Sequence, residues 1–202
     1  KIKIKYILET HFHADFISGH LDLFEKYNCP IIYGPNAKPN YEFQLKNDGD
    51  EIKFGNLKIK VIHTPGHTLE SVCYLLFDEK NKENSIFTGD TLFIGDVGIP
   101  DVAQRYENIS KEELANKLYY SLNKIMELPD DVIVYPGHGK GTQCGKNLSS
   151  ETKSTIGKQK LLNYALNFRN KDDFIKSICS NIPKPPKYFI ESVKKNINGY
   201  NN

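Results

Sequence analysis

The order of apolar and polar residues predicts several short strands. Ile2–Leu8 alternates apolar and charged residues and then becomes wholly apolar, which is typical of a strand entering a buried sheet. Residues 51–54 and 57–62 alternate on either side of Gly55-Asn56 and predict a hairpin. Further apolar runs, bounded by turn residues, predict buried strands at residues 30–35, 71–77, 85–87 and 132–135.

Other segments have the apolar spacing of helices, at residues 16–27, 114–126, 149–168, 171–180 and 188–197. A capping-box pattern beginning at Ser110 precedes the second of them. Strands followed by helices indicate an α/β fold. We therefore expect one domain over residues 1–202, with a core at 1–180 and a C-terminal helical segment with a frayed end at 181–202.

Composition and charge limit the kinds of binding partner and the cellular location that the sequence predicts. The chain has 202 residues, of which 39% are hydrophobic and 26% charged, which suits one globular domain. Its 27 basic and 25 acidic residues give a net charge of +2, so charge alone predicts no nucleic-acid and no membrane partner. The four cysteines lie far apart, which excludes a zinc ribbon and a dense disulfide framework and predicts a reducing, cytoplasmic location. No signal peptide or membrane-spanning apolar run is evident.

Candidate chemistry begins directly behind the first strand, where His11, His13 and Asp15 follow one another at a spacing of two. In an extended backbone, residues two apart project to the same side, so the two imidazoles can converge on one ion. The carboxyl ends of strands are where open α/β sheets bind ligands. For this pair alone, a histidine-rich surface loop is the alternative.

Three further motifs repeat the same order of strand, tight turn and ligand. Pro65-Gly66 forces a turn that makes His67 a better ligand than His63. Asp90 follows a glycine after an apolar run, and as an isolated residue it would more commonly make a turn or cap a helix. His138 follows Pro136-Gly137. The one histidine outside these motifs is His20, which we expect to pack inside or to support a ligand.

In their order and spacing, these motifs resemble the metallo-β-lactamase superfamily. The sequences of Glu9–His20 and Cys144–Ser149 resemble those of persulfide dioxygenases of the type fused to rhodanese domains. Among the hydrolases of the superfamily, glyoxalase II is the nearer relative. The resemblance implies an α/β fold, the αββα sandwich, with the metal at one sheet edge. It also implies that the first strands of the sandwich lie upstream of Lys1 and that a rhodanese module accompanies the domain.

The resemblance also implies the cofactor and the site residues. It implies Fe(II), one per chain, held by His11, His67 and Asp90, with zinc as the alternative metal. His13, Asp15 and His138 are the expected catalytic residues, which orient ligands and water.

One departure favours a single metal. Dizinc hydrolases of the superfamily have a histidine immediately after the aspartate, where this chain has Phe16, and phenylalanine cannot coordinate a metal.

The predicted function is an iron-dependent persulfide dioxygenase that oxidises glutathione persulfide or another thiol persulfide with O₂ to sulfite and thiol. The alternatives are a zinc-dependent thiolester hydrolase like hydroxyacylglutathione hydrolase and a metal-binding remnant without turnover. Ile99 stands where the family usually has an arginine for the substrate carboxylate. We therefore take Arg105, Lys140 and Cys144 as candidate substrate-binding residues. The sequence leaves open whether the chain forms a homo-oligomer.

Overall fold

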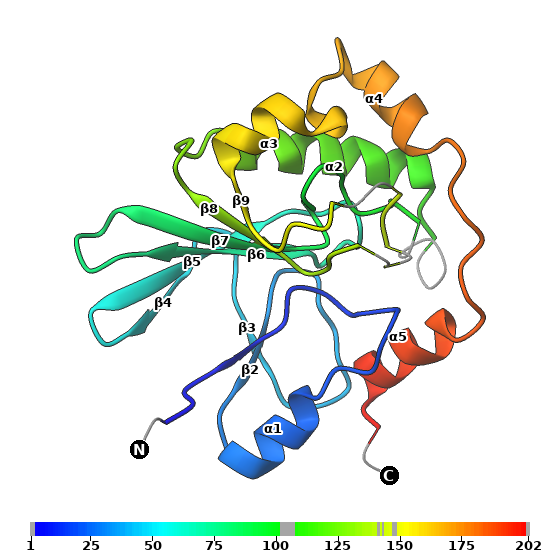
Figure 1. The fold of residues 1–202 in the computed structure, drawn as a ribbon. Coiled ribbons are helices and arrows are strands. Elements are labelled where there is room, and N and C mark those ends of the chain that lie inside the picture. The colour runs from blue at the N-terminus through cyan, green and yellow to red at the C-terminus, as the bar shows by residue number, and fades with distance from the viewer. Residues whose placement is uncertain (1–2, 102–107, 141, 143, 147–148, 201–202) are drawn as a thin grey trace.

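Two β-sheets pack face to face, and helices cover the outer face of each (Figure 1). The computed structural model describes residues 3–101, 108–140, 142, 144–146 and 149–200. This is the αββα arrangement that the sequence predicts, so the predicted fold class is confirmed. Apolar side chains from both sheets, including Ile32, Val61 and Tyr74, fill the space between them.

The smaller sheet has the order β1-β2-β3 with parallel neighbours, and the larger sheet has the order β4-β5-β6-β7-β8-β9. Neighbours in the larger sheet are antiparallel except for β7 and β8, which are parallel. The strands are β1 (Ile7–Leu8), β2 (Ile31–Tyr33), β3 (Gln44–Leu45), β4 (Glu51–Phe54), β5 (Leu57–His63), β6 (Val72–Phe77), β7 (Glu83–Gly89), β8 (Ile133–Pro136) and β9 (Ser154–Thr155).

The helices form the two outer layers. Their bounds are α1 (His20–Tyr27), α2 (Lys111–Met126), α3 (Ile156–Leu162), the 3₁₀ helix η2 (Tyr164–Leu166), α4 (Lys171–Ile178) and α5 (Phe189–Asn198). Helix α2 begins with the predicted capping box between Ser110 and Glu113. Its buried stripe, with Leu118 and Leu122, packs on the larger sheet. In the described part of the chain, no helix combines the length and apolarity that a bilayer crossing requires.

Two predicted helices are wrong in extent. The predicted helix at 149–168 is instead strand β9 followed by α3 and η2, because Ser154 and Thr155 pair with Val134 and Ile133 of β8. The predicted helix at 16–27 begins only at His20. Residues before it stay irregular, and the hydroxyl of Ser18 donates to Glu9 instead of capping the helix.

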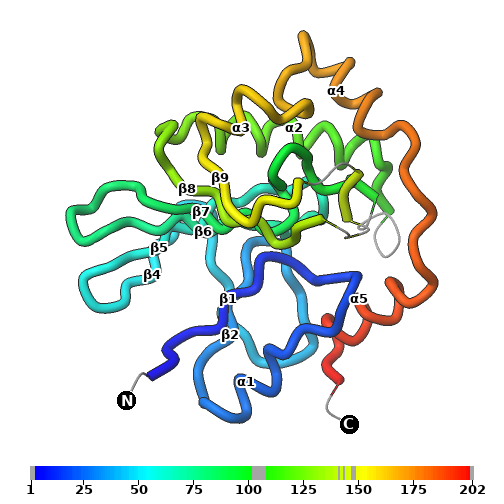
Figure 2. Tube along the Cα trace, viewed as in Figure 1, coloured from blue at the N-terminus to red at the C-terminus, as the bar shows by residue number. Residues whose placement is uncertain are grey.

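The last helix returns the chain to its beginning. Figure 2 shows the C-terminal segment descending past the larger sheet to the side where α1 and the N-terminal segment lie. Helix α5 buries Phe189 and Val193 against Ala14, Phe93 and Cys144. The C-terminal segment therefore packs on the loop that carries the first candidate ligands.

Candidate metal centre

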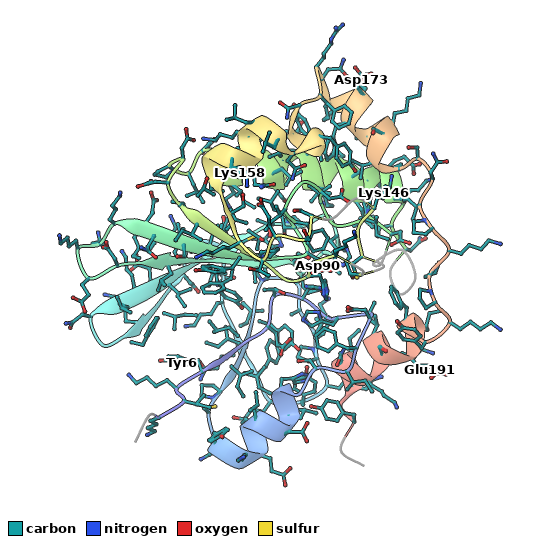
Figure 3. All side chains as sticks on the ribbon, in the orientation of Figure 1. Tyr6, Asp90, Lys146, Lys158, Asp173 and Glu191 are labelled. Carbon is teal, nitrogen blue, oxygen red and sulfur yellow. The ribbon has the colours of Figure 1, made fainter. Side chains whose placement is uncertain are left out.

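The predicted ligands converge because four strand ends lie at one edge of the sandwich. The loop after β1 carries the first ligands, and the turns after β5, β7 and β8 carry His67, Asp90 and His138. Figure 3 labels Asp90 in the interior, where the N-terminal segment meets the turns of the larger sheet. Six residues separated by up to 127 positions in the sequence thus form one centre.

The first cluster comprises His11, His67 and Asp90, and all three side chains are buried. Oδ2 of Asp90 lies 3.5 Å from Nε2 of His67 and 3.8 Å from Nε2 of His11. The three donor atoms lie within 4.8 Å of one another, which is close enough for one ion to contact all of them.

The second cluster comprises His13, Asp15 and His138, which are half-buried. Nε2 of His138 lies 3.3 Å from Oδ2 of Asp15 and 3.4 Å from Oδ1 of Asp90. Asp90 therefore presents one oxygen to each cluster. It is the group that the two clusters share.

Buried ligand atoms without hydrogen-bond partners in the described residues show that the centre fits a metal ion. Nδ1 of His13, Oδ1 of Asp15, both carboxylate oxygens of Asp90 and Nε2 of His138 are buried, and none has a hydrogen-bond partner in the described part of the chain. Buried polar atoms are normally hydrogen bonded, because leaving them unpaired costs about 1–3 kcal/mol each. Imidazole nitrogens and carboxylate oxygens are ligands for iron and zinc alike, so these residues could hold either.

The electrostatics of the centre favour neutral His11 and His13 beside a charged Asp90, whereas the carboxylates of Asp90 and Asp15 outweigh burial and raise the pKa of His138. Burial, and then the neighbouring His13, lower the pKa of His11 well below its usual value. Burial would raise the pKa of Asp90, but the surrounding histidines outweigh it and hold that pKa far below its usual range. Neutral imidazole and ionised carboxylate are the forms that bind metals.

Two contacts aim the ring nitrogens of the first cluster. Nδ1 of His67 donates to the backbone carbonyl of Ile99 at 2.8 Å, which directs Nε2 of that ring at the centre. Nδ1 of His11 lies 3.0 Å from the hydroxyl of Thr10. The position where the family usually has an arginine therefore supports His67 through its backbone, while the Ile99 side chain is buried.

Two glycines allow the close approach of the strand ends. Gly89 has a φ of +49°, a left-handed conformation that turns the chain after β7 and delivers Asp90. A Cβ at Gly137 would lie 2.6 Å from Oδ1 of Asp90, so this position has no room for a side chain.

Phe16 takes the place of a further imidazole in the second cluster. Its ring centroid lies 4.3 Å from that of His13 at an interplanar angle of 34°, and 6.5 Å from that of His138. The side chain is 43% exposed. Phe16 therefore shields the second cluster from one side without offering a ligand.

The candidate substrate-binding residues differ in their placement. Arg105 lies outside the described residues. Lys140 is exposed, two residues beyond His138. Cys144 is buried, and its sulfur lies within 4.8 Å of ligand atoms of Asp90 and His138. Burial raises the pKa of its thiol.

The remaining two histidines lie outside both clusters. Nε2 of His63 is 2.9 Å from the carbonyl of Leu69, so this imidazole is held in its own turn. His20 is buried beside the ring of Tyr41, with centroids 5.0 Å apart. Three residues that support the centre, Glu9, Ser18 and Asn196, are not predicted from the sequence. Glu9 stood within the histidine motif, whereas no local pattern marks Asn196.

Glu9 and His20 predict opposite pH dependences of stability. Burial raises the pKa of Glu9 from 4.5 to about 7, whereas burial lowers the pKa of His20 from 6.5 to about 4. The stability from Glu9 is therefore present below about pH 4.5 and lost as pH rises to 7. The stability from His20 is present above about pH 6.5 and lost as pH falls to 4.

We expect the two effects to oppose each other in the metal-free protein between about pH 4.5 and 6.5. Glu9→Gln leaves the His20 effect, so this variant should lose stability as pH falls. His20→Phe keeps the Glu9 effect, so it should lose less stability than Glu9→Gln over the same range, because the lowered pKa values of His11 and His13 act equally in both variants. Urea unfolding at several pH values measures both slopes, and parallel slopes in the two variants would contradict the assignment.

Comparison with known proteins identifies the family. A family model described as the metallo-beta-lactamase superfamily matches residues 1–138. A probable hydroxyacylglutathione hydrolase, glo2 of Schizosaccharomyces pombe, is 32% identical over 168 residues, which cover 83% of this chain and 60% of that protein. The hydroxyacylglutathione hydrolase of Brucella anthropi is 39% identical over 139 residues, covering 67% of this chain and 47% of that protein.

Solved structures agree with the sequence relatives. A metallo-beta-lactamase from Staphylococcus aureus has a TM-score of 0.91 and 36% identity, covering 99% of this chain and 60% of that one. ETHE1 from Myxococcus xanthus has a TM-score of 0.78 and 28% identity, covering 96% of this chain and 77% of that one. The chain thus spans about half to 60% of the length of the curated relatives named here. Fold, ligand motifs and relatives together show that the chain belongs to the metallo-β-lactamase superfamily.

Proposed function

We propose that the chain is an iron-dependent dioxygenase that acts on a small-molecule thiol persulfide. One observation carries the proposal: the two clusters differ in their burial and in the side chains around them. His11, His67 and Asp90 form a fully buried group of two imidazoles and one carboxylate, the ligand set of many non-haem iron oxygenases. The second cluster is half-buried and has Phe16 where another imidazole would complete it.

The reaction proposed is RSSH + O₂ + H₂O → RSH + SO₃²⁻ + 2 H⁺. When bound, Fe(II) supplies the redox chemistry that lets O₂ react with sulfur, which no protein side chain can supply. His11, His67 and Asp90 would hold the metal. His13, Asp15 and His138 lie beside them, where they would orient the substrate sulfur and water and carry protons.

Aromatic residues surround the half-buried cluster. The ring of Phe93 lies 6.1 Å from that of His138, and the ring of Phe16 lies against His13. These rings exclude water from one side of the centre and leave an apolar neighbourhood that suits a polarisable sulfur. Cys144, whose thiol borders the same cluster, is a candidate contact for the persulfide.

A zinc-dependent thiolester hydrolase is the second candidate. Two observations favour it: relatives named hydroxyacylglutathione hydrolase match the chain, and His13, Asp15 and His138 could hold a second ion beside the first. Zinc has no accessible redox step, but it can polarise a carbonyl and generate hydroxide from water. The two candidates therefore differ in the metal that supports turnover.

We expect the Fe(II) form to consume O₂ and release sulfite from glutathione persulfide, and to be inactive without O₂. The Zn(II) form should not restore this activity because zinc cannot change its oxidation state. Oxygen uptake and sulfite formation measure the first reaction, and thiol release from an acylated glutathione measures the second. Thiol release by the zinc form, with no oxygen uptake by the iron form, would establish the hydrolase instead.

We also expect about one metal ion per chain, because the second cluster is only half-buried and Phe16 offers it no further imidazole, whereas the first cluster is fully buried. Metal analysis after loading and gel filtration measures the ratio. A ratio near two for both iron and zinc would contradict the assignment of the second cluster to positioning. If every metal-loaded form were inactive on both substrates, the chain would be a metal-binding remnant without turnover.

A further inference from the structure

The loop from Glu9 to the start of α1 carries three of the six centre residues, yet residues 9–19 have no helix or strand. Its first half is held by the larger sheet. The amide of Val72 donates to the carbonyl of Thr10 at 2.9 Å, and the amide of Phe12 donates to the carboxylate of Glu70 at 2.9 Å. These contacts fix His11, which lies between Thr10 and Phe12. They do not reach residues 13–18.

The second half of the loop is held by one side chain of the last helix. Nδ2 of Asn196 donates to the carbonyls of His13 and Phe16, each at 2.8 Å. Its Oδ1 accepts from the amide of Ser18 at 2.9 Å. Asn196 is 1% exposed, so these three bonds are shielded from water. One amide group thus pins the loop at three points on either side of Asp15.

A second connection closes the loop on itself. The hydroxyl of Ser18 donates to Oε1 of Glu9 at 2.7 Å, and Oε2 of Glu9 lies 3.6 Å from Nε2 of His13. Because Nε2 faces this carboxylate, the unpaired Nδ1 of His13 is the nitrogen left for the metal centre. Asn196 fixes Ser18, Ser18 orients Glu9, and Glu9 orients His13.

We propose that Asn196 is a positioning residue for the metal centre, which holds His13 and Asp15 in the arrangement that the ion requires. Only an amide offers two donors and one acceptor in this geometry, so neither aspartate nor alanine can replace it. This inference rests on the proposal that the centre binds a metal. It does not depend on which reaction the metal supports.

The test compares Asn196→Asp and Asn196→Ala with Asn198→Ala as the matched control. Asn198 lies on the same helix, but its side chain bonds to exposed Asn40, away from the loop. The aspartate variant keeps the size of the side chain and the acceptor for Ser18, whereas its carboxylate faces the carbonyls of His13 and Phe16. Two measurements are made on each variant of the 202-residue chain: amide exchange of Ser18 without metal, and Zn(II) affinity by competition with a chelator.

We expect faster exchange at Ser18 in Asn196→Ala and Zn(II) affinity lowered about 10–100-fold in both Asn196 variants, the range seen when groups supporting a metal ligand are removed. Asn198→Ala should match the unmodified protein. Affinity equal to that of the control, in folded Asn196 variants, would overturn the inference by showing that Asn196 serves packing alone. Unchanged exchange at Ser18 in Asn196→Ala would also overturn it. If the unmodified protein binds no metal, the proposed function fails, whereas the exchange measurement still reports whether Asn196 holds the loop.

Discussion

Asp90→Ala is expected to abolish metal binding and activity together. Asp90 is the shared carboxylate: Oδ2 faces the two imidazoles of the first cluster, and Oδ1 faces His138 of the second. Removing it leaves the first cluster with two neutral ligands and takes away the negative charge that offsets the charge of the cation. We expect metal affinity to fall by more than about 100-fold, which exceeds the usual effect of removing a supporting residue. Chelator competition and metal analysis measure the loss.

His13→Ala is the comparison for this variant. His13 lies in the half-buried cluster and contributes one nitrogen, so its removal should weaken metal binding less than the loss of Asp90. Thermal unfolding of the metal-free proteins separates metal loss from misfolding. If His13→Ala loses the ion as completely as Asp90→Ala, then His13 is itself a principal ligand and its assignment to positioning is wrong.

Gly137→Ala is expected to displace Asp90 and to remove most of the metal affinity. The added Cβ would lie 2.6 Å from Oδ1 of Asp90 and 3.1 Å from the backbone of Gly89. The backbone cannot withdraw freely, because the amide of Gly137 donates to the carbonyl of Gly89 at 2.8 Å. Overpacking of this kind costs about 1–3 kcal/mol. We therefore expect a stability loss in that range and a larger loss of function, because the side chain forced to move is the shared carboxylate.

Gly139→Ala is the matched control, two residues along the same turn. A Cβ at Gly139 would meet no heavy atom within 4 Å. This variant should bind metal as the unmodified protein does, and zinc titration of both variants measures the difference. Equal affinity for the two would show that the turn relaxes without moving Asp90.

The sequence predicts the centre better than it predicts the scaffold around it. Each ligand follows an apolar strand and a turn, and those local signals place His11, His67, Asp90 and His138 at strand ends without knowledge of the sheet order. Strand β9 could not be predicted in this way, because Ser154 becomes a strand residue only by pairing with Val134, which lies twenty positions earlier. Local spacing therefore assigns residues 154–155 to the helix that follows them. The start of α1 was placed too early because Ser18 bonds to Glu9 rather than to the helix.

Asn196, which supports the metal centre, could not be predicted from the sequence for a different reason. Asn196 has an ordinary helical neighbourhood in the sequence, and its partners lie 178 to 183 residues away. Polar side chains inside an amphipathic helix usually face solvent, so nothing local distinguishes Asn196 from exposed Asn198. Only the packing of α5 on the loop reveals the difference.

The separation between Asn196 and its partners also bears on the order of events during synthesis. A chain emerging from the ribosome presents His11 and His13 long before α5. Contacts of high sequence separation form late, because the entropy of closing a long loop must be overcome first. We therefore expect the nascent chain to bind metal weakly until α5 has been released. Metal loading would then follow the synthesis of α5, and a chain stalled before residue 189 would not retain the ion.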